Sequence, residues 1–547
     1  MSITTHHLLE KGYFTDELPP PFHTQDIATH QAAIKNHFAT FSKADRDKIN
    51  ETLPVLFSTP KTGIYRRMMA LPNPIHQLPL SELIASHWEE IRTYWKSAGL
   101  SASTPIFKIK DKRAIIQISK YQAFKEKCIS VSYDRSYELK ADVSKYFPSI
   151  YTHSIPWALH TKAVAKSKSG REVKSLGNML DKAVRSGQSG QTKGIPIGTD
   201  TSRIIAEIVG TGLDIDLIAA FKKDGINYMG YRFIDDYQLY FHSAADAEKA
   251  LKILHKVLNN YSLDLNDEKT IINSAPYKLD NDWSYLLNSC PLRDKEESIQ
   301  AHDLITYVNL VIDMAIKHPA DYVIKYGIKR LLKTEIFPDN WSLLEALILK
   351  LGTYEPAALP SVAVFLLQNK LEVNKDRIKN FVQNLLQQRI SRGHHFEVAW
   401  SLWIAKQFHI EIPKDLAQQI IDSRDVISIL ILLDMQDNSL VSFDLDLKDL
   451  KSEFTEENLY NELWLLIYEA THKKWISSTA VSDSFYFQKL NALKVSFYDT
   501  DAELEIGETN VMDSISEKEF AGLKFHTRSK TQKFKKSGRK VKVGSDY

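Results

Sequence analysis

Cysteine is scarce in this sequence, because only Cys128 and Cys290 occur among 547 residues. A secreted protein of this length usually carries several disulfides, so the scarcity favours a reducing compartment. Two cysteines this far apart also lack the ligand spacing of a zinc site. The sequence has no P-loop, no Gly-x-Ser-x-Gly and no His-Glu-x-x-His motif, which argues against the common nucleoside-triphosphatase, hydrolase and metalloprotease classes.

Long apolar runs are missing too, since no stretch approaches the roughly 18–20 residues that span a bilayer. The opening segment MSITTHHLLEKGYF has no basic stretch followed by an apolar one, so we expect no signal peptide. Hydrophobic residues make up 43 % of the chain and charged residues 25 %, as in a globular protein with room for two to four domains. We therefore expect a cytoplasmic protein with no membrane contact.

The net charge of +2 conceals a basic segment at the end of the sequence. Residues 521–547 hold nine lysines and arginines against one acid, Asp546, so the rest of the chain is net acidic. Such a segment is typical of proteins that bind a phosphate backbone. The alternative is a solvated terminus that binds nothing.

The pattern of apolar residues divides the chain near residue 295. Before it, short β-prone runs alternate with helical ones: residues 120–143 read as strand material leading into Asp142, 227–242 as a hairpin, and 245–265 as a helix. After it, amphipathic helices follow one another with breaks at proline and glycine. This region predicts either a HEAT-like solenoid or one irregular helical domain.

Three aspartates stand where the strands of the first half are expected to end. Asp142 closes one β-prone run, and Asp235-Asp236 lies between two others. Adjacent buried acids repel one another unless cations neutralise them. Phosphoryl transfer with two divalent metals needs such a set of hard oxygen ligands. The alternative for Asp235-Asp236 alone is an ordinary polar turn.

Four segments together resemble the palm of a reverse transcriptase. Asp142-Val143 with Phe147 is similar to motif A, residues 190–208 to motif B, residues 231–241 to motif C, and residues 263–270, with Lys269, to motif D. The four occur in the order of that family. Motif B departs from the usual pattern, because Lys193 stands where a glutamine normally precedes the glycine.

Further segments resemble the bacterial abortive-infection (Abi) reverse transcriptases, which defend bacteria against phages. These are GYFTDELPPPF at 12–22, LPNP at 71–74, YFPSIYTHSIPWALH at 146–160 and GIPIGTDTSR at 194–203. The resemblance implies a prophage-encoded bacterial member that forms a homo-oligomer. It implies an α+β fold with the following parts: an N-terminal extension docked on the polymerase (1–60), fingers (61–140), palm (141–290), an all-α HEAT-like domain in place of a thumb (291–520) and a basic tail (521–547).

The resemblance also implies roles for the carboxylates. Asp142 and Asp235 are expected to bridge two Mg²⁺ ions, with Mn²⁺ as an alternative, and Asp236 to support them. The Val143 carbonyl is expected to ligate the metal on the nucleotide side.

Other residues are implied to bind or process the nucleotide. Phe147 resembles the steric gate against a 2′-hydroxyl, its alternative being core packing. Lys269 is a candidate proton donor to pyrophosphate. Gly194 and Pro196 are expected to let the backbone approach the nucleotide, with Gln191 nearby.

Basic fingers residues should bind the triphosphate, and Lys108 and Arg113 are candidates, together with Lys110 and Lys112. A solvated face explains these four equally well.

The first functional hypothesis is a DNA polymerase that adds dNTPs without a template, primed by a protein hydroxyl, so that the DNA product stays covalently attached. The priming residue is not readable, although Tyr13 is a candidate, with packing under the ELPPPF segment as its alternative. The second hypothesis is an RNA-templated reverse transcriptase with a nucleic-acid primer. The third is an inactive palm that serves as a binding scaffold.

Overall fold

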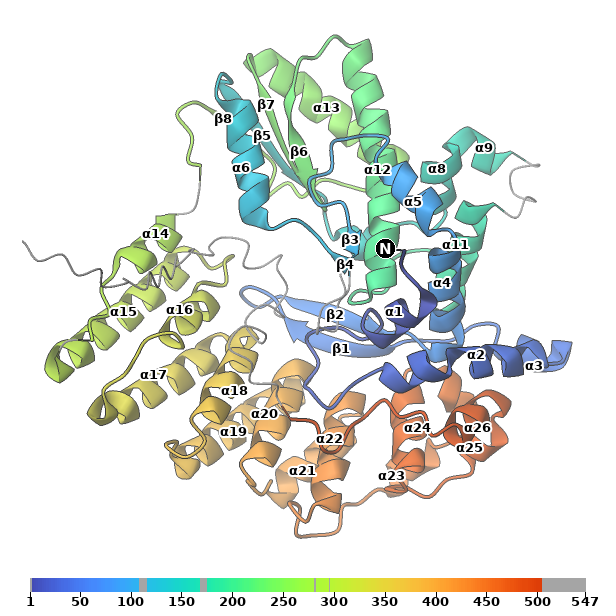
Figure 1. The fold of residues 1–547 in the computed structure, drawn as a ribbon, viewed down its shortest axis with the longest axis vertical. Helices are drawn as coiled ribbons and strands as arrows, with labels where there is room; N and C mark the ends of the chain where they lie inside the picture. The colour runs from blue at the N-terminus through green and yellow to red at the C-terminus, as the bar shows by residue number, and fades with distance from the viewer. Residues whose placement is uncertain (1, 108–115, 168–174, 280–281, 295, 504–547) are drawn as a thin grey trace, which may run out of the picture.

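The computed structural model describes five segments of the chain: residues 2–107, 116–167, 175–279, 282–294 and 296–503. Their buried apolar side chains form two cores. One core contains Ile3, Leu8 and residues between Leu80 and Leu263; the other joins residues between Leu9 and Leu78 to the helices after residue 282. The two cores correspond to the upper and lower halves of the molecule (Figure 1).

The upper half is built on a four-stranded antiparallel sheet in the order β6-β7-β5-β8. Its strands are β5 (Tyr137–Asp142), β6 (Met229–Phe233), β7 (Asp236–Phe241) and β8 (Ile271–Ser274). β6 and β7 form the hairpin expected at 227–242, which is confirmed. In the register of β5 and β7, Asp142 lies opposite Asp236. The remaining strands of this half, β3 (Ile106–Phe107) and β4 (Ile116–Gln117), form a separate pair.

Helices cover this sheet. α12 (Asp200–Lys223) is buried along most of its length, and α13 (Ala244–Asn260) packs on β5 and β7. The helix expected at 245–265 is confirmed, with Ser243 capping its first turn. Among its described residues, this half also contains α4 (Pro74–Ser86), α5 (Trp88–Trp95), α6 (Tyr121–Ser132), α7 (Tyr146–Ser149), α8 (Ser154–His160), α9 (Lys162–Lys166) and α11 (Leu176–Ser186).

The prediction of strand material over 120–143 was wrong for its first part. Residues 121–132 form α6, and only Tyr137–Asp142 is a strand. Phe124, Cys128 and Ser132 are the buried residues of α6, at the four-residue spacing of one helix face. That face packs on β6. The β-branched residues of the segment favour a strand, but this preference is weak and tertiary packing overrides it.

The N-terminal segment lies between the two halves. It contains α1 (Thr5–Glu10), α2 (Gln25–Ala39), α3 (Lys43–Lys48) and a hairpin of β1 (Val55–Pro60) and β2 (Arg66–Leu71). The backbone of this segment bonds to both neighbours: the Asp200 N–H donates to the Gly12 carbonyl (2.8 Å), and the His23 N–H donates to the Phe497 carbonyl (3.0 Å). Figure 1 shows the β1–β2 hairpin between the sheet above and the helices below.

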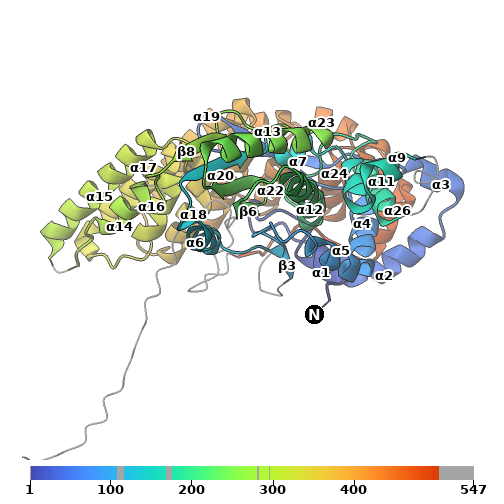
Figure 2. The same cartoon turned by 90° about the horizontal axis from the view of Figure 1, so that it is seen from above.

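The lower half is helical, and the described residues after 282 contain no β-strand. All the amphipathic segments expected after residue 295 form helices. A HEAT-like repeat is not confirmed. The helices range from 21 residues in α15 to four in α25, and 3₁₀ turns interrupt the series of helices. Seen from above, α14 to α17 extend beyond the sheet at one side (Figure 2). The elements are α14 (Asp282–Ser289), α15 (Glu297–Lys317), α16 (Val323–Leu331), η1 (Pro338–Asn340), α17 (Trp341–Tyr354), η2 (Pro356–Ala358), α18 (Leu359–Gln368), α19 (Lys375–Arg389), η3 (Ile390–Arg392), α20 (His395–Gln407), α21 (Lys414–Asp422), α22 (Val426–Asp437), α23 (Lys448–Ser452), η4 (Glu457–Tyr460), α24 (Trp464–His472), α25 (Ala480–Asp483) and α26 (Phe485–Ala492).

Among the helices of the described segments, none is both long and apolar enough to cross a membrane. Two groups of sequence-predicted residues lie outside those segments: Lys108 to Arg113, and the basic tail at 521–547.

Candidate active site

The three aspartates meet at one end of the sheet. Phe233, the last residue of β6, pairs with Asp236, the first of β7, so Ile234 and Asp235 form a two-residue turn. The strand register sets Asp142 beside Asp236, and the Val143 N–H donates to the Asp235 carbonyl (3.1 Å). Motifs 93 residues apart in the sequence are therefore joined by backbone hydrogen bonds.

The segment expected as motif D closes the site from the other side of Asp142. The Asn266 N–H donates to the Asp142 carbonyl (2.8 Å), and the Asn266 side-chain amide donates to Asp142 Oδ1 (3.2 Å). Lys269 Nζ donates to Asp142 Oδ2 at 3.0 Å. Burial by itself lowers the pKa of Lys269, but Asp142, Asp236 and Asp235 more than offset this and raise it. Lys269 is therefore a protonated ammonium at neutral pH.

The donor set of this site suits hard divalent cations, since three carboxylates and the Val143 carbonyl occupy adjacent backbone positions. Within the described residues, no group of three or more acidic, histidine or cysteine side chains is already arranged to hold a metal ion. The Lys269 ammonium bonds to Asp142 instead. Asp142 accepts two side-chain bonds here, and a carboxylate has about four lone-pair sites, so a cation can bind beside Lys269 or replace it. The residues are therefore of the right donor types for a metal site.

Motifs A and B pack directly against each other. The Gly194 N–H donates to the Ile150 carbonyl (2.8 Å), and the Ile195 N–H donates to the Phe147 carbonyl (3.0 Å). Gly194 has φ +89°, and a Cβ there would lie 3.2 Å from the Pro148 carbonyl oxygen, so the position requires glycine. Phe147 is half-buried and packs against the core of the upper half.

A residue that the sequence did not single out holds the motif B loop. Gln188 Nε2 donates to the Gln191 carbonyl (2.6 Å) and to the Gly194 carbonyl (2.9 Å). Gln191 itself is exposed, and Pro196 is half-buried. The side-chain amide of Gln188 therefore fixes the loop that contains Gln191 and Pro196. Only its closeness to the motif in sequence could have signalled it.

The tip of the β1–β2 hairpin brings further basic residues toward the carboxylates. The pKa of Lys61 is lowered overall, because burial, Lys269 and Arg67 lower it by more than Asp142 and Asp235 raise it. Lys61 is therefore within electrostatic range of both aspartates. The Ala70 N–H donates to the Ile197 carbonyl (2.9 Å), which ties this hairpin to the motif B segment. The sequence pattern pointed to such cations only near residues 108–113.

Tyr13 lies in the lower core, with no exposed surface. Its hydroxyl donates to the Pro72 carbonyl at 2.5 Å, and burial raises its pKa well above the ordinary value. This environment favours packing over a role as an attacking hydroxyl.

Comparison with known families agrees with this geometry. Residues 79–296 match the model of the family described as reverse transcriptase (RNA-dependent DNA polymerase). The matched range contains the three aspartates and Lys269, so this part of the chain is a reverse-transcriptase domain of the nucleotidyltransferase kind. Such domains generally use divalent metal ions. The β1–β2 hairpin precedes the matched range.

Among solved structures, the chain is similar to telomerase from Candida albicans with the TWJ fragment of telomeric RNA, at 12 % identity over 75 % of this chain and 68 % of that chain, with a TM-score of 0.29. It is also similar to apo telomerase from Candida tropicalis, at 11 % identity over 75 % of each chain, with a TM-score of 0.30. TM-scores this low carry no argument. No curated protein matches the sequence.

Proposed function

We propose that this chain is a DNA polymerase of the reverse-transcriptase type that adds dNTPs by two-metal phosphoryl transfer. The observation that carries the proposal is the meeting of Asp142, Asp235 and Asp236 at one end of the sheet, with Lys269 bonded to Asp142. Three motifs far apart in sequence converge there. The intact set also argues against an inactive palm that only binds partners.

Each residue has a distinct part in this proposal. Two divalent cations, when bound, help to deprotonate the attacking hydroxyl and offset the charge of the triphosphate. Asp142, Asp235 and the Val143 carbonyl would hold them. Lys269, protonated at neutral pH, can give its proton to the leaving pyrophosphate.

Further contacts would select and hold the nucleotide. The Phe147 ring would exclude a 2′-hydroxyl, and Lys61 supplies positive charge for the triphosphate.

The proposal extends to template-independent synthesis primed by a protein hydroxyl, within anti-phage abortive infection and as a homo-oligomer. The Abi-like segments and the loss of the usual glutamine before Gly194 support it. Tyr65 is a better priming candidate than the buried Tyr13. It is 66 % exposed and sits on the same hairpin tip as Lys61, whose N–H donates to the Tyr65 carbonyl (3.0 Å).

The decisive experiment incubates the purified protein with Mg²⁺ and labelled dNTPs alone. We expect label that survives boiling in detergent, shifts the mobility of the protein and is removed by a DNA nuclease. Its sequence should follow the dNTP supply and ignore added RNA. Label that appears only with an added primer and template, and separates from the protein in detergent, would establish an RNA-templated reverse transcriptase. No incorporation under either condition would establish an inactive palm.

The priming residue is tested with Tyr65→Phe, with Tyr354→Phe as the matched control. Tyr354 is 54 % exposed at the end of α17 in the helical half. Tyr65→Phe should abolish protein-linked label but keep extension of an added oligonucleotide, whereas Tyr354→Phe should keep both. Full labelling of the Tyr65→Phe protein would assign priming to another hydroxyl.

The proposed anti-phage role is tested in cells that express the parent or the Asp235→Asn variant. Phage plaques should be reduced only by the parent. Equal protection by both proteins would separate defence from polymerisation.

A further inference from the structure

The turn that carries Asp235 has an unfavourable backbone. Ile234, its first residue, has φ +60°, a conformation that β-branched residues rarely adopt. Two-residue hairpin turns with a positive φ at this position usually place glycine there. The surrounding structure must therefore impose this conformation on Ile234.

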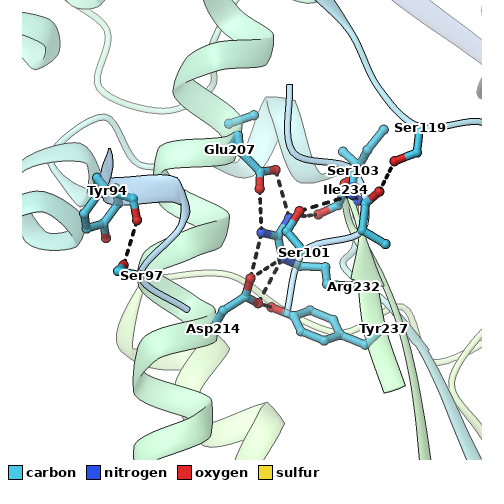
Figure 3. Close-up of polar contacts among 12 residues, drawn as sticks. Tyr94, Ser97, Ser101, Ser103, Ser119, Glu207, Asp214, Arg232, Ile234 and Tyr237 are labelled. Atoms are coloured by element: carbon cyan, nitrogen blue, oxygen red, sulfur yellow. Dashed lines mark hydrogen bonds and ion pairs between the residues drawn. The ribbon is translucent and has the colours of Figure 1, made fainter. Parts of the chain in front are cut away.

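Side chains bond both polar backbone groups of Ile234. Its N–H donates to Ser103 Oγ at 2.6 Å, and its carbonyl accepts from an Arg232 guanidinium nitrogen at 2.8 Å. Figure 3 shows Ser103 and Arg232 reaching Ile234 from different chain segments. The carbonyl of the next residue, Asp235, accepts from the Val143 N–H. Three polar backbone groups of the turn are thus hydrogen-bonded.

Arg232 is itself rigidly fixed. Only 1 % of the residue is exposed, and its guanidinium donates to Asp214 (2.8–2.9 Å) and to Glu207 (3.1–3.2 Å), both on α12. Gly210, one helical turn from each acid, leaves the space for it: a Cβ at that position would lie 2.7 Å from a guanidinium nitrogen. Bidentate pairing of this kind fixes orientation as well as charge.

Backbone contacts hold Arg232 from the other side. Its N–H donates to the Leu100 carbonyl (2.9 Å), and its carbonyl accepts from the Ala102 N–H (2.8 Å). The same short segment supplies Ser103, so residues 100–103 and α12 form a common support.

We propose that Arg232 and Ser103 are positioning residues that impose the strained turn on Ile234 and so aim the Asp235 carboxylate at the metal site. Asp235 needs this support because its neighbour Ile234 would otherwise relax out of the left-handed region. The proposal rests on the polymerase function, but it makes a separate statement about metal binding that does not require turnover.

The test replaces Arg232 with lysine, which keeps the charge but cannot contact Asp214, Glu207 and the Ile234 carbonyl together. The matched control is Arg377→Lys in the helical half. Arg377 also contacts a buried acid with a guanidinium nitrogen, at 2.9 Å from Glu345. Ser103→Ala is a milder second variant that removes one bond to the turn.

Two measurements are made on each folded protein. The first is a Mn²⁺ titration followed by the electron paramagnetic resonance signal of free Mn²⁺, in which the binding lost in Asp235→Asn defines the site. The second separates kcat from KM for dNTP incorporation. Because a displacement of about 1 Å can cost about 10²-fold in rate, Arg232→Lys should lower kcat by that order with little change in KM. Its Mn²⁺ binding should weaken toward that of Asp235→Asn, Ser103→Ala should show smaller changes in the same direction, and Arg377→Lys should match the parent.

Parent-like Mn²⁺ binding and kcat in Arg232→Lys, with only a lower melting temperature, would overturn the proposal, as would equal losses in Arg377→Lys. If Arg232→Lys does not fold, parent-like values in Ser103→Ala overturn it. A parent protein that binds Mn²⁺ through Asp235 but incorporates no dNTP would refute the polymerase function alone.

Discussion

The two halves of the molecule use buried acids differently. In the sheet-containing half, Glu207 and Asp214 form ion pairs with the buried Arg232, which donates to the Ile234 carbonyl in the turn before Asp236. In the helical half, Glu469 is fully buried and accepts from the Phe497 backbone N–H and the Ser496 hydroxyl. The first arrangement supports the turn that contains Asp235, whereas the second attaches the end of the helical half to its core. We therefore expect that replacing buried acids changes mainly activity in the sheet-containing half and mainly stability in the helical half.

An ion pair between Arg66 and Glu397 links the β1–β2 hairpin to the helical half. Arg66 of β2 donates to both carboxylate oxygens of Glu397 on α20, at 2.6 and 2.8 Å. Burial raises the pKa of Glu397, but His394 and Arg66 lower it by more, so the carboxylate is charged. Lys61 lies on the same hairpin as Arg66. The helical half thereby fixes the hairpin whose tip reaches toward the aspartates.

The largest effect on activity should come from the carboxylates proposed to bind the metal ions. Asp142→Asn or Asp235→Asn removes a negative ligand, so dNTP incorporation should fall by several orders of magnitude. Both variants should still fold, because relief of repulsion between neighbouring acids offsets lost contacts such as the ion pair of Asp142 with Lys269. Asp224→Asn, at the exposed end of α12, is the control and should match the parent. Near-parental incorporation by either variant would contradict the assignment of the site.

Lys269→Ala should have the next largest effect. Loss of a general acid typically costs about 10²–10⁴-fold, so incorporation should slow by about that factor while KM for dNTPs changes little. Lys223→Ala, at the exposed end of α12, controls for loss of a surface charge. A raised KM with an unchanged kcat would instead make Lys269 a phosphate ligand.

Phe147→Ala should change selectivity more than rate. If the ring blocks the 2′-hydroxyl, the variant should accept ribonucleotides far better than the parent, measured as the ratio of rNTP to dNTP incorporation. The half-buried ring also packs against Tyr146, so some loss of stability is expected. An unchanged ratio would leave only the packing role.

Glu469→Gln should alter stability without affecting incorporation. Burial raises the pKa of Glu469 to about 7, against an ordinary value of 4.5. Stabilisation by the protonated form is complete below about pH 4.5 and is lost as the pH rises through 7, a change on the order of 3 kcal/mol. The unfolding free energy of the parent, from urea titrations at pH 5 and pH 8, should therefore fall more than that of Glu469→Gln. The exposed Glu462→Gln control should lose as much unfolding free energy between pH 5 and pH 8 as the parent does. An equal loss in all three proteins would contradict the titration of a buried Glu469.

Local patterns in the sequence predicted much of the palm. The β6–β7 hairpin around Asp235-Asp236, the helix α13 and the change to an all-helical region follow from the spacing of apolar residues. The four motifs indicated the reverse-transcriptase domain that the family match supports. The strand interpretation of residues 121–132 failed because both β-prone and helical residues occur there, and only packing on β6 resolves the choice.

The sequence by itself determined which acids were candidates for the site, because acidic residues between β-prone runs are a local feature. Only the tertiary structure decided what surrounds them. Lys61 is within electrostatic range of Asp142 and Asp235 from a hairpin outside the family match, and Lys269 bonds to Asp142 across 127 positions. In the sequence, Arg232 is an ordinary strand residue. Only the fold shows that Glu207, Asp214 and Gly210 of α12 pack against it. Such contacts depend on the packing of distant segments, which short-range spacing does not encode.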